Sequence, residues 1–284
     1  MLETYGYFDG KIMKVSGARI APHDLGILRG YGIFDFYRTY HGNPFLLKEH
    51  AGRFRRSASA IGLKAYISDA ALDRVTRQLL AKNGLKDGFF RIVLTGGPSL
   101  DGIQSTSSTF YVLAYSNMSP DPKLYMTGAS LMTHDHQRQY AAAKTNNYIT
   151  AVRLQNERKR KGAAEILYTN DGKVLECSTS NFFIVKKGKI ITAKDGILIG
   201  VTRNAVIRIA KKKYHIEERA VSISEMFSAD EAFLTGTTKD ILPITSIDGK
   251  KIGKGAGKGK VGPVTKDLMK IFREYIEKTC RPKK

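Results

Sequence analysis

A polar, proline-containing segment, SNMSPDPK at 116–123, divides this chain of 284 residues into two parts that each mix strand and helix patterns. Segments of this composition commonly connect domains. We therefore predict a smaller N-terminal domain at 1–115, a linker at 116–123 and a larger C-terminal domain at 124–284. Because strands and helices mix in both, the expected fold class is α/β (α+β), with a site where the domains meet.

Local patterns predict the elements of the first part. Its expected strands are a hairpin over 3–20 with an Asp9-Gly10 turn, an aromatic-rich strand into which 26–40 leads, and strands at 89–95 and 109–115. The apolar spacing becomes helical at 48–61 and 68–83, and Ser68 is the expected N-cap of the second helix.

The second part continues the same mixture of patterns. Its expected strands lie at 124–133, within 165–193, and at 231–235. Its expected helices lie at 147–161, 201–213, 224–227 and 262–279, the last with Pro263 in its first turn.

Composition excludes several classes of protein. The formal net charge is +21, but the basic clusters fall on expected helix surfaces and in a glycine-rich loop, so nucleic-acid binding is not expected. No apolar run reaches the roughly 20 residues that cross a bilayer, and the first residues lack a signal-peptide pattern. Two cysteines, Cys177 and Cys280, are too few for a disulfide framework and favour a cytoplasmic protein. The His134-Asp135-His136 run lacks a third ligand, so no metal site is expected.

Four separated features together match the requirements of pyridoxal 5'-phosphate. Lys144 in KTNNY can supply an amine for the aldehyde, and Glu176, in an otherwise apolar strand, can supply an acid for the ring nitrogen. Gly200 begins a predicted helix whose first N–H groups can bind phosphate, and the turn Gly236-Thr237-Thr238 adds hydroxyls. Arg53 is the expected charged phosphate ligand.

The same motifs resemble the class IV pyridoxal-phosphate enzymes over roughly residues 20–265. The matching segments are YGIFDFYRTY, HAGRFRRSA, KTNNY, LECSTSNFF, ILIGVTR and FLTGTTKDILP. The resemblance implies fold type IV, the D-amino-acid-aminotransferase-like fold with a barrel-like C-terminal domain, and at least a homodimer. It also implies that Lys144 is the Schiff-base lysine and that Glu176 pairs with the ring nitrogen. The other cofactor contacts that it implies are Arg53, Tyr148, Val201, Thr202, Thr237 and Thr238.

The resemblance also suggests a ping-pong transfer of an amino group between an amino acid and a 2-oxo acid such as 2-oxoglutarate. The Arg-x-His pair that some D-specific members use is absent from GGPSLDGIQS, so Arg29 and Arg91 are the expected carboxylate ligands, assisted by Lys239. This pattern favours D-amino acids. A branched-chain L-amino-acid aminotransferase stays open because of Tyr148 and Arg38, and so does aminodeoxychorismate lyase, which shares Lys-x-x-Asn. Arg29 can also be read as a loop residue at a dimer surface.

Overall fold

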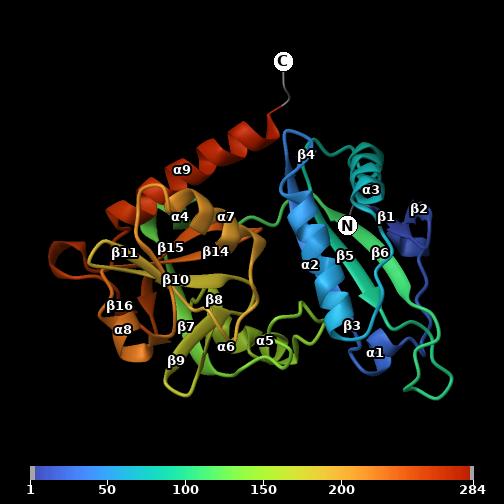
Figure 1. Ribbon diagram of the computed structural model, residues 1–284, viewed down its shortest axis with the longest axis horizontal. Helices are drawn as coiled ribbons and strands as arrows, with labels where there is room; N and C mark the ends of the chain where they lie inside the picture. The colour runs from blue at the N-terminus through green and yellow to red at the C-terminus, as the bar shows by residue number, and fades with distance from the viewer. Residues whose placement is uncertain (1–3, 282–284) are drawn as a thin grey trace. The chain divides into compact units, whose positions relative to one another are not determined.

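The computed structural model describes residues 4–281, which form two compact units (Figure 1). The first unit is the described part of Met1–Met118, Ala143–Tyr148 and Ile276–Lys284, and the second is Ser119–Ala142 with Ile149–Tyr275. The division after Met118 falls inside the predicted linker. Unlike the predicted domains, however, these units are not continuous in sequence, because the segment that contains Lys144 groups with the first unit.

The first unit is built on a six-stranded antiparallel sheet in the order β2-β1-β6-β5-β3-β4. Its strands are β1 (Tyr5–Phe8), β2 (Lys11–Lys14), β3 (Gly32–Tyr40), β4 (Asn43–Pro44), β5 (Phe89–Thr95) and β6 (Thr109–Tyr115). The predicted hairpin and the strands at 89–95 and 109–115 are confirmed.

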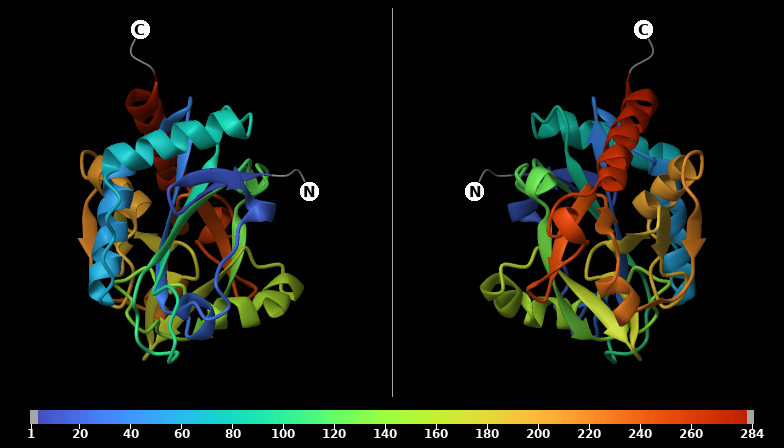
Figure 2. Two further views of the ribbon diagram at one scale, coloured as in Figure 1. Left: turned by 90° about the vertical axis from the view of Figure 1, so that its right-hand side faces the viewer. Right: turned by 90° about the vertical axis from the view of Figure 1, so that its left-hand side faces the viewer.

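Helices α2 (Leu47–Ala60) and α3 (Asp69–Lys82) bury one face of this sheet and run in different directions (Figure 2). Ile33 and Tyr37 of β3 contribute to that core, whereas Phe34 and Phe36 point to the opposite face. Ser68 is the predicted N-cap, and its Oγ accepts a hydrogen bond from the N–H of Ala71 at 3.1 Å. The first unit also contains the 3-10 turn η1 (Val15–Gly17).

The segment 26–40 leads into β3 as predicted, but its first residues belong to a short helix that the patterns did not indicate, α1 (Leu25–Leu28). The cause is a local cap. Asp24 is fully buried, and its carboxylate accepts a hydrogen bond from the N–H of Gly26 at 2.6 Å. The carboxylate thereby satisfies an N–H group that a helix start leaves without a partner.

The second unit contains a ten-stranded sheet. Its strands are β7 (Ala129–Asp135), β8 (Glu165–Asn170), β9 (Lys173–Cys177), β10 (Asn181–Lys186), β11 (Lys189–Thr192), β12 (Ile216–Glu218), β13 (Val221–Ser222), β14 (Glu231–Gly236), β15 (Asp240–Ile247) and β16 (Lys250–Lys251). The main order is β12-β11-β10-β14-β15-β7-β8-β9-β13, with β16 beside β15. The pairs β15–β7, β7–β8 and β11–β12 are parallel.

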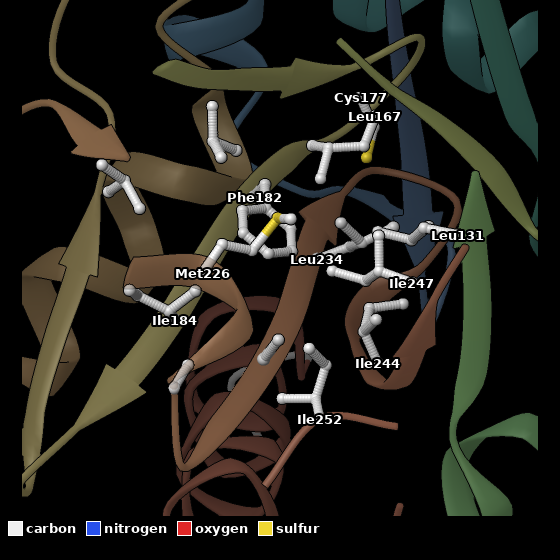
Figure 3. Packing of buried hydrophobic residues seen from close by; sticks show 14 of the residues in the cluster. Leu131, Leu167, Cys177, Phe182, Ile184, Met226, Leu234, Ile244, Ile247 and Ile252 are labelled. Carbon is white, nitrogen blue, oxygen red and sulfur yellow. The ribbon is translucent and has the colours of Figure 1, made fainter. Parts of the chain in front are cut away.

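An additional pairing between β9 and β10 closes part of this sheet into a barrel. The closing pair is Glu176 opposite Asn181, so strands β10, β14, β15, β7, β8 and β9 form a ring. Alternate residues of these strands point inward and build an apolar core that includes Phe182, Leu234 and Ile244 (Figure 3). The expected barrel-like C-terminal domain is confirmed, and Glu176 lies at its seam.

The remaining helical segments are α4 (Leu124–Thr127), α5 (Ile149–Arg153), α6 (Gln155–Arg160), α7 (Val201–Ala210), α8 (Ile223–Phe227), the 3-10 turn η2 (Gly255–Gly257) and the long helix α9 (Pro263–Cys280). The predicted strand at 124–133 is wrong over its first turn, because α4 ends at Gly128, whose φ of 78° favours glycine. The predicted helix at 147–161 is divided into α5 and α6. Within residues 4–281, each helix is too short or too polar to cross a membrane.

Candidate active site

Lys144 lies on a short segment that crosses the start of β3. Phe34 donates its N–H to the carbonyl of Lys144 at 2.9 Å, and the N–H of Lys144 donates to Ser57 Oγ of α2 at 3.0 Å. The segment approaches closely from one side and β5 from the other, since a Cβ on Gly32 would lie 2.7 Å from Asn146 Nδ2 and 2.8 Å from the carbonyl oxygen of Leu94. The lysine is therefore held in place from both neighbouring elements and is only 8% exposed.

Phe34 brings three of the predicted site residues together. Lys144 Nζ lies 4.5 Å from the centre of the Phe34 ring, and Arg91 Cζ lies 5.0 Å from it. The Tyr148 ring meets the same ring edge-on at 5.5 Å. Arg91 also lies 5.5 Å from the Phe36 ring, and its Nε is buried without a hydrogen-bond partner among residues 4–281. An amine and a guanidinium thus share one aromatic ring, an arrangement that could receive a carboxylate beside the amine.

Arg53 is buried in a charged cluster of the first unit. Its Nε and Nη2 donate to the two oxygens of Asp35 at 2.7 and 2.8 Å, and His50 Nδ1 donates to the same carboxylate at 2.7 Å. Burial alone would raise the pKa of Asp35, but Arg53 and His50 hold this pKa well below its ordinary value. Burial lowers the pKa of His50, which keeps the imidazole neutral near pH 7. Asp35 therefore fixes the guanidinium of Arg53 from one side.

Arg29 is exposed at the end of α1. Its N–H donates to the carbonyl of Leu25, and its Nη1 donates to the carbonyl of Leu28 at 3.1 Å. Among the described residues, no hydrogen bond, ion pair or ring contact joins Arg29 to Arg91. Of the two predicted carboxylate ligands, only Arg91 therefore adjoins Lys144 through a shared ring.

Glu176 is buried at the barrel seam and is held by an arginine that the sequence did not suggest. Arg138 donates from Nε at 3.0 Å and from Nη2 at 2.7 Å to Glu176 Oε1, and Nη2 also reaches the carbonyl of Ala141. Asn181 Nδ2 lies 3.4 Å from Oε2 and donates to the carbonyl of Leu198 at 2.8 Å. The strand end that carries Glu176 is thereby tied to the segment that leads into α7.

The N-terminus of α7 is shaped to receive an anion. Gly200 is its N-cap and makes no side-chain bond to the N–H groups of the first turn, where Val201 and Thr202 lie. A Cβ on Gly200 would lie 2.1 Å from Asn181 Oδ1, so only glycine fits there. Free N–H groups and the helix dipole both favour a phosphate at such a position.

The predicted second phosphate turn follows β14. Lys239 donates its N–H to the carbonyl of Gly236 at 3.0 Å, which closes the turn that contains Thr237 and Thr238. Lys239 Nζ forms an ion pair with the buried Glu165 at 2.7 Å and lies 3.4 Å from Thr238 Oγ1. The ammonium of Lys239 is therefore already neutralised within the second unit.

Sequence patterns missed Phe34, Asp35, Arg138 and Glu165. An aspartate inside the apolar run IFDFY was a local sign of a buried ion pair, but nothing local indicates its partner. Arg138 and Glu176 are 38 positions apart, so no sequence spacing reveals their contact.

Comparison with known proteins now identifies the family. The profile for Amino-transferase class IV matches residues 32–247, and the chain belongs to this family. It is a pyridoxal-phosphate-dependent aminotransferase with the fold of type IV enzymes. It is 32% identical over 275 residues to a D-alanine aminotransferase of Bacillus licheniformis, with 95% of this chain and 96% of that protein covered.

Two further similar proteins are named as branched-chain aminotransferases. A putative branched-chain-amino-acid aminotransferase of Methanocaldococcus jannaschii is 31% identical over 284 residues, with 96% of each chain covered. The crystal structure of the branched-chain aminotransferase of Thermoproteus uzoniensis with norvaline matches with a TM-score of 0.86. The two sequences are 27% identical, and the match covers 98% of this chain and 96% of that one.

The residues present fit pyridoxal phosphate. The first turn of α7 offers N–H donors for a phosphate, and the buried carboxylate of Glu176 offers an acceptor for a ring N–H. The buried amine of Lys144 can react with an aldehyde. Each of these three groups thus matches one functional group of the cofactor.

Proposed function

We propose that this protein transfers the amino group of a D-amino acid to a 2-oxo acid such as 2-oxoglutarate. The observation that carries the proposal is Arg91, whose buried Nε has no hydrogen-bond partner among residues 4–281 and whose guanidinium shares the Phe34 ring with Lys144. A guanidinium so placed can bind the carboxylate of a substrate whose reacting carbon lies at the amine. The D-alanine aminotransferases among the relatives support this choice.

We assign each functional group of the cofactor to particular residues. Its phosphate is assigned to the α7 N-terminus at Val201 and Thr202, to Thr237 and Thr238, and to Arg53, whose guanidinium Asp35 orients. Its ring nitrogen is assigned to Glu176, whose Oε1 Arg138 holds. Tyr148 packs on Phe34 beside Lys144 and is assigned to the edge of the ring.

The bound cofactor supplies an aldehyde that accepts the amino group and a ring that withdraws electrons from the substrate Cα. Lys144 would act as the general base and acid, since its amine can take the proton from the substrate Cα and give it up again. Glu176, as a carboxylate, keeps the ring nitrogen protonated. Arg91 orients the substrate carboxylate. A 2-oxo acid reverses the sequence, which makes the reaction ping-pong.

A branched-chain L-amino-acid aminotransferase is the second candidate. The face of the sheet beside Lys144 is strongly aromatic, with Phe34, Phe36, Phe89 and Tyr111 packed together, and such a surface suits an apolar side chain. Relatives and solved structures with that substrate name support it.

Half-reactions with D-glutamate, D-alanine, L-glutamate and L-leucine test the proposal, followed through the absorbance of the cofactor. We expect the D-amino acids to react faster. Arg91→Gln should slow the reactions of D-glutamate and 2-oxoglutarate by about one to two orders of magnitude, because a charge-assisted hydrogen bond contributes about 1.5–3 kcal/mol. Arg208→Gln is the matched control, since Arg208 also lies over an aromatic ring but on the exposed side of α7. If L-leucine reacts faster than the D-amino acids, and if Arg91→Gln reacts with D-glutamate and 2-oxoglutarate as fast as the wild type, the second candidate is favoured.

A homodimer is part of the same proposal. Four large apolar side chains of the first unit are strongly exposed: Ile27 (60%), Leu28 (41%), Leu100 (100%) and Ile103 (72%). Leu28 Cδ1 would lie 4.0 Å from a Cβ on Gly102, so α1 and the 100–103 loop are neighbours. A second copy could bury this patch, which neighbours the exposed Arg29. Light scattering should give a dimer mass, and Leu100→Asp with Ile103→Asp should give monomers.

A cytoplasmic location completes the proposal. Cys177 and Cys280 are both buried and unpaired thiols. Proteins of reducing compartments commonly keep their cysteines in this state.

A further inference from the structure

A single buried carboxylate, that of Glu165 at the start of β8, receives five donors. Ser178 Oγ donates to Oε2 at 3.1 Å, and the N–H of Thr179 donates to the same oxygen at 2.8 Å. Thr179 Oγ1 donates to Oε1 at 2.9 Å, and Ser180 Oγ donates to it at 2.5 Å. Lys239 Nζ completes the set at 2.7 Å from Oε1.

These donors come from two separate turns. Residues Ser178, Thr179 and Ser180 connect β9 to β10, directly between Glu176 and Asn181. Lys239 belongs to the turn after β14 that contains Thr238, and its ammonium also donates to Thr179 Oγ1 at 3.1 Å. The turns approach closely, since a Cβ on Gly236 would lie 3.0 Å from Ser180 Oγ.

We propose that the Glu165–Lys239 ion pair has a positioning role: it fixes the turn at 178–180 and the turn at 236–239 relative to each other. Lys239 is then a positioning residue and not a ligand of the substrate carboxylate. The inference rests on the proposed assignment of Glu176 to the ring nitrogen and of Thr238 to the phosphate. One buried pair would thereby hold the residues assigned to two separate groups of the cofactor, the ring nitrogen and the phosphate.

Burial and charge support a positioning role. The Glu165 side chain is 4% exposed and the Lys239 side chain 12%, so solvent screens their attraction little. An ammonium that a buried carboxylate neutralises at 2.7 Å attracts a second carboxylate weakly. Although burial alone would raise the pKa of Glu165, Lys239 and the hydrogen bonds hold this pKa below its ordinary value. The carboxylate therefore stays charged, and removal of Lys239 leaves that charge buried and uncompensated.

The test measures two quantities in Lys239→Met: the Kd of pyridoxal phosphate for the apoprotein and the KM for 2-oxoglutarate in the reconstituted enzyme. We expect the Kd to rise by about tenfold or more, the range seen when a supporting partner of a ligand is lost, and the KM to stay unchanged. Lys239→Arg should restore most of the affinity, because it keeps the charge. Lys189→Met is the control, since it breaks an exposed pair with Glu217.

The opposite result, an unchanged Kd with a raised KM for 2-oxoglutarate, would overturn the proposal and make Lys239 a substrate ligand. If Lys239→Met does not fold, Thr179→Val decides in its place, because it removes one donor and one acceptor of the network without a change of charge. Glu176→Gln and Thr238→Val distinguish a failure of the assigned cofactor contacts from a failure of the positioning role. Unchanged cofactor affinity in both would refute the assignment of the cofactor contacts, whereas weakened affinity in both, with an unchanged Kd in Lys239→Met, would refute the positioning role alone.

Discussion

Replacement of Asp35 by asparagine should strongly destabilise the first unit. The carboxylate is fully buried and accepts hydrogen bonds from the N–H of Phe36, from His50 Nδ1, and from Nε and Nη2 of Arg53. Asparagine has nearly the same shape but offers only one acceptor oxygen. In either orientation its NH₂ group faces a donor, and the buried guanidinium of Arg53 loses the counter-charge of Asp35.

The size of the effect follows from that burial. Breaking a buried ion pair by removing one partner costs about 3–5 kcal/mol. For a protein of this size each kcal/mol lowers Tm by roughly 2–4 °C, so Asp35→Asn should lower the Tm of the apoprotein by roughly 6–20 °C. Differential scanning calorimetry measures this directly. The Kd of pyridoxal phosphate should also rise, because Arg53 loses the group that orients it.

Asp73→Asn is the matched control. Arg77 Nε and Asp73 Oδ2 are 2.8 Å apart, but their side chains are 53% and 36% exposed, and exposed pairs of this kind contribute little to stability. If Asp35→Asn unfolds within about 1 kcal/mol of the wild type, where surface substitutions commonly fall, the buried cluster does not stabilise the fold as argued.

Three further predictions concern Lys144, Glu176 and His50. Lys144→Ala should abolish turnover, and borohydride reduction of the wild type should attach the cofactor to the peptide that contains Lys144; mass spectrometry that finds it on another lysine would contradict the assignment. Glu176→Gln should lower kcat by about tenfold to a hundredfold, as expected for a group that tunes a bound cofactor, and an unchanged kcat would leave Glu176 a structural role. Burial lowers the pKa of His50, so the unfolded chain binds a proton below about pH 6.5 that the folded protein does not. The free energy of unfolding should therefore fall as the pH drops below about 6.5, and urea titrations should show a smaller fall in His50→Asn.

Local sequence determined much of the fold. The strands at 89–95 and 109–115 and the N-cap Ser68 follow from side-chain alternation and from a hydroxyl beside a free N–H group, which act over a few residues. At α1, which the patterns did not indicate, and at α4, where the prediction failed, a buried aspartate and a glycine turn decided the backbone, and neither is visible in the alternation of apolar residues. The motifs also singled out Lys144, Glu176 and the glycine turns, because the chemistry of the cofactor demands those groups.

Tertiary structure alone decided which charges meet. The sequence marks Glu176 and Arg53 as ionisable, but only the closure of the barrel brings Arg138 to Glu176, and only the packing of α2 on β3 brings Arg53 to Asp35. Lys239 is one of 47 lysines and arginines until the turn after β14 lies against Glu165. Strand and helix periods specify which face of an element is buried, whereas a pair of buried charges depends on the register between elements distant in sequence, and that register is set only when the core packs.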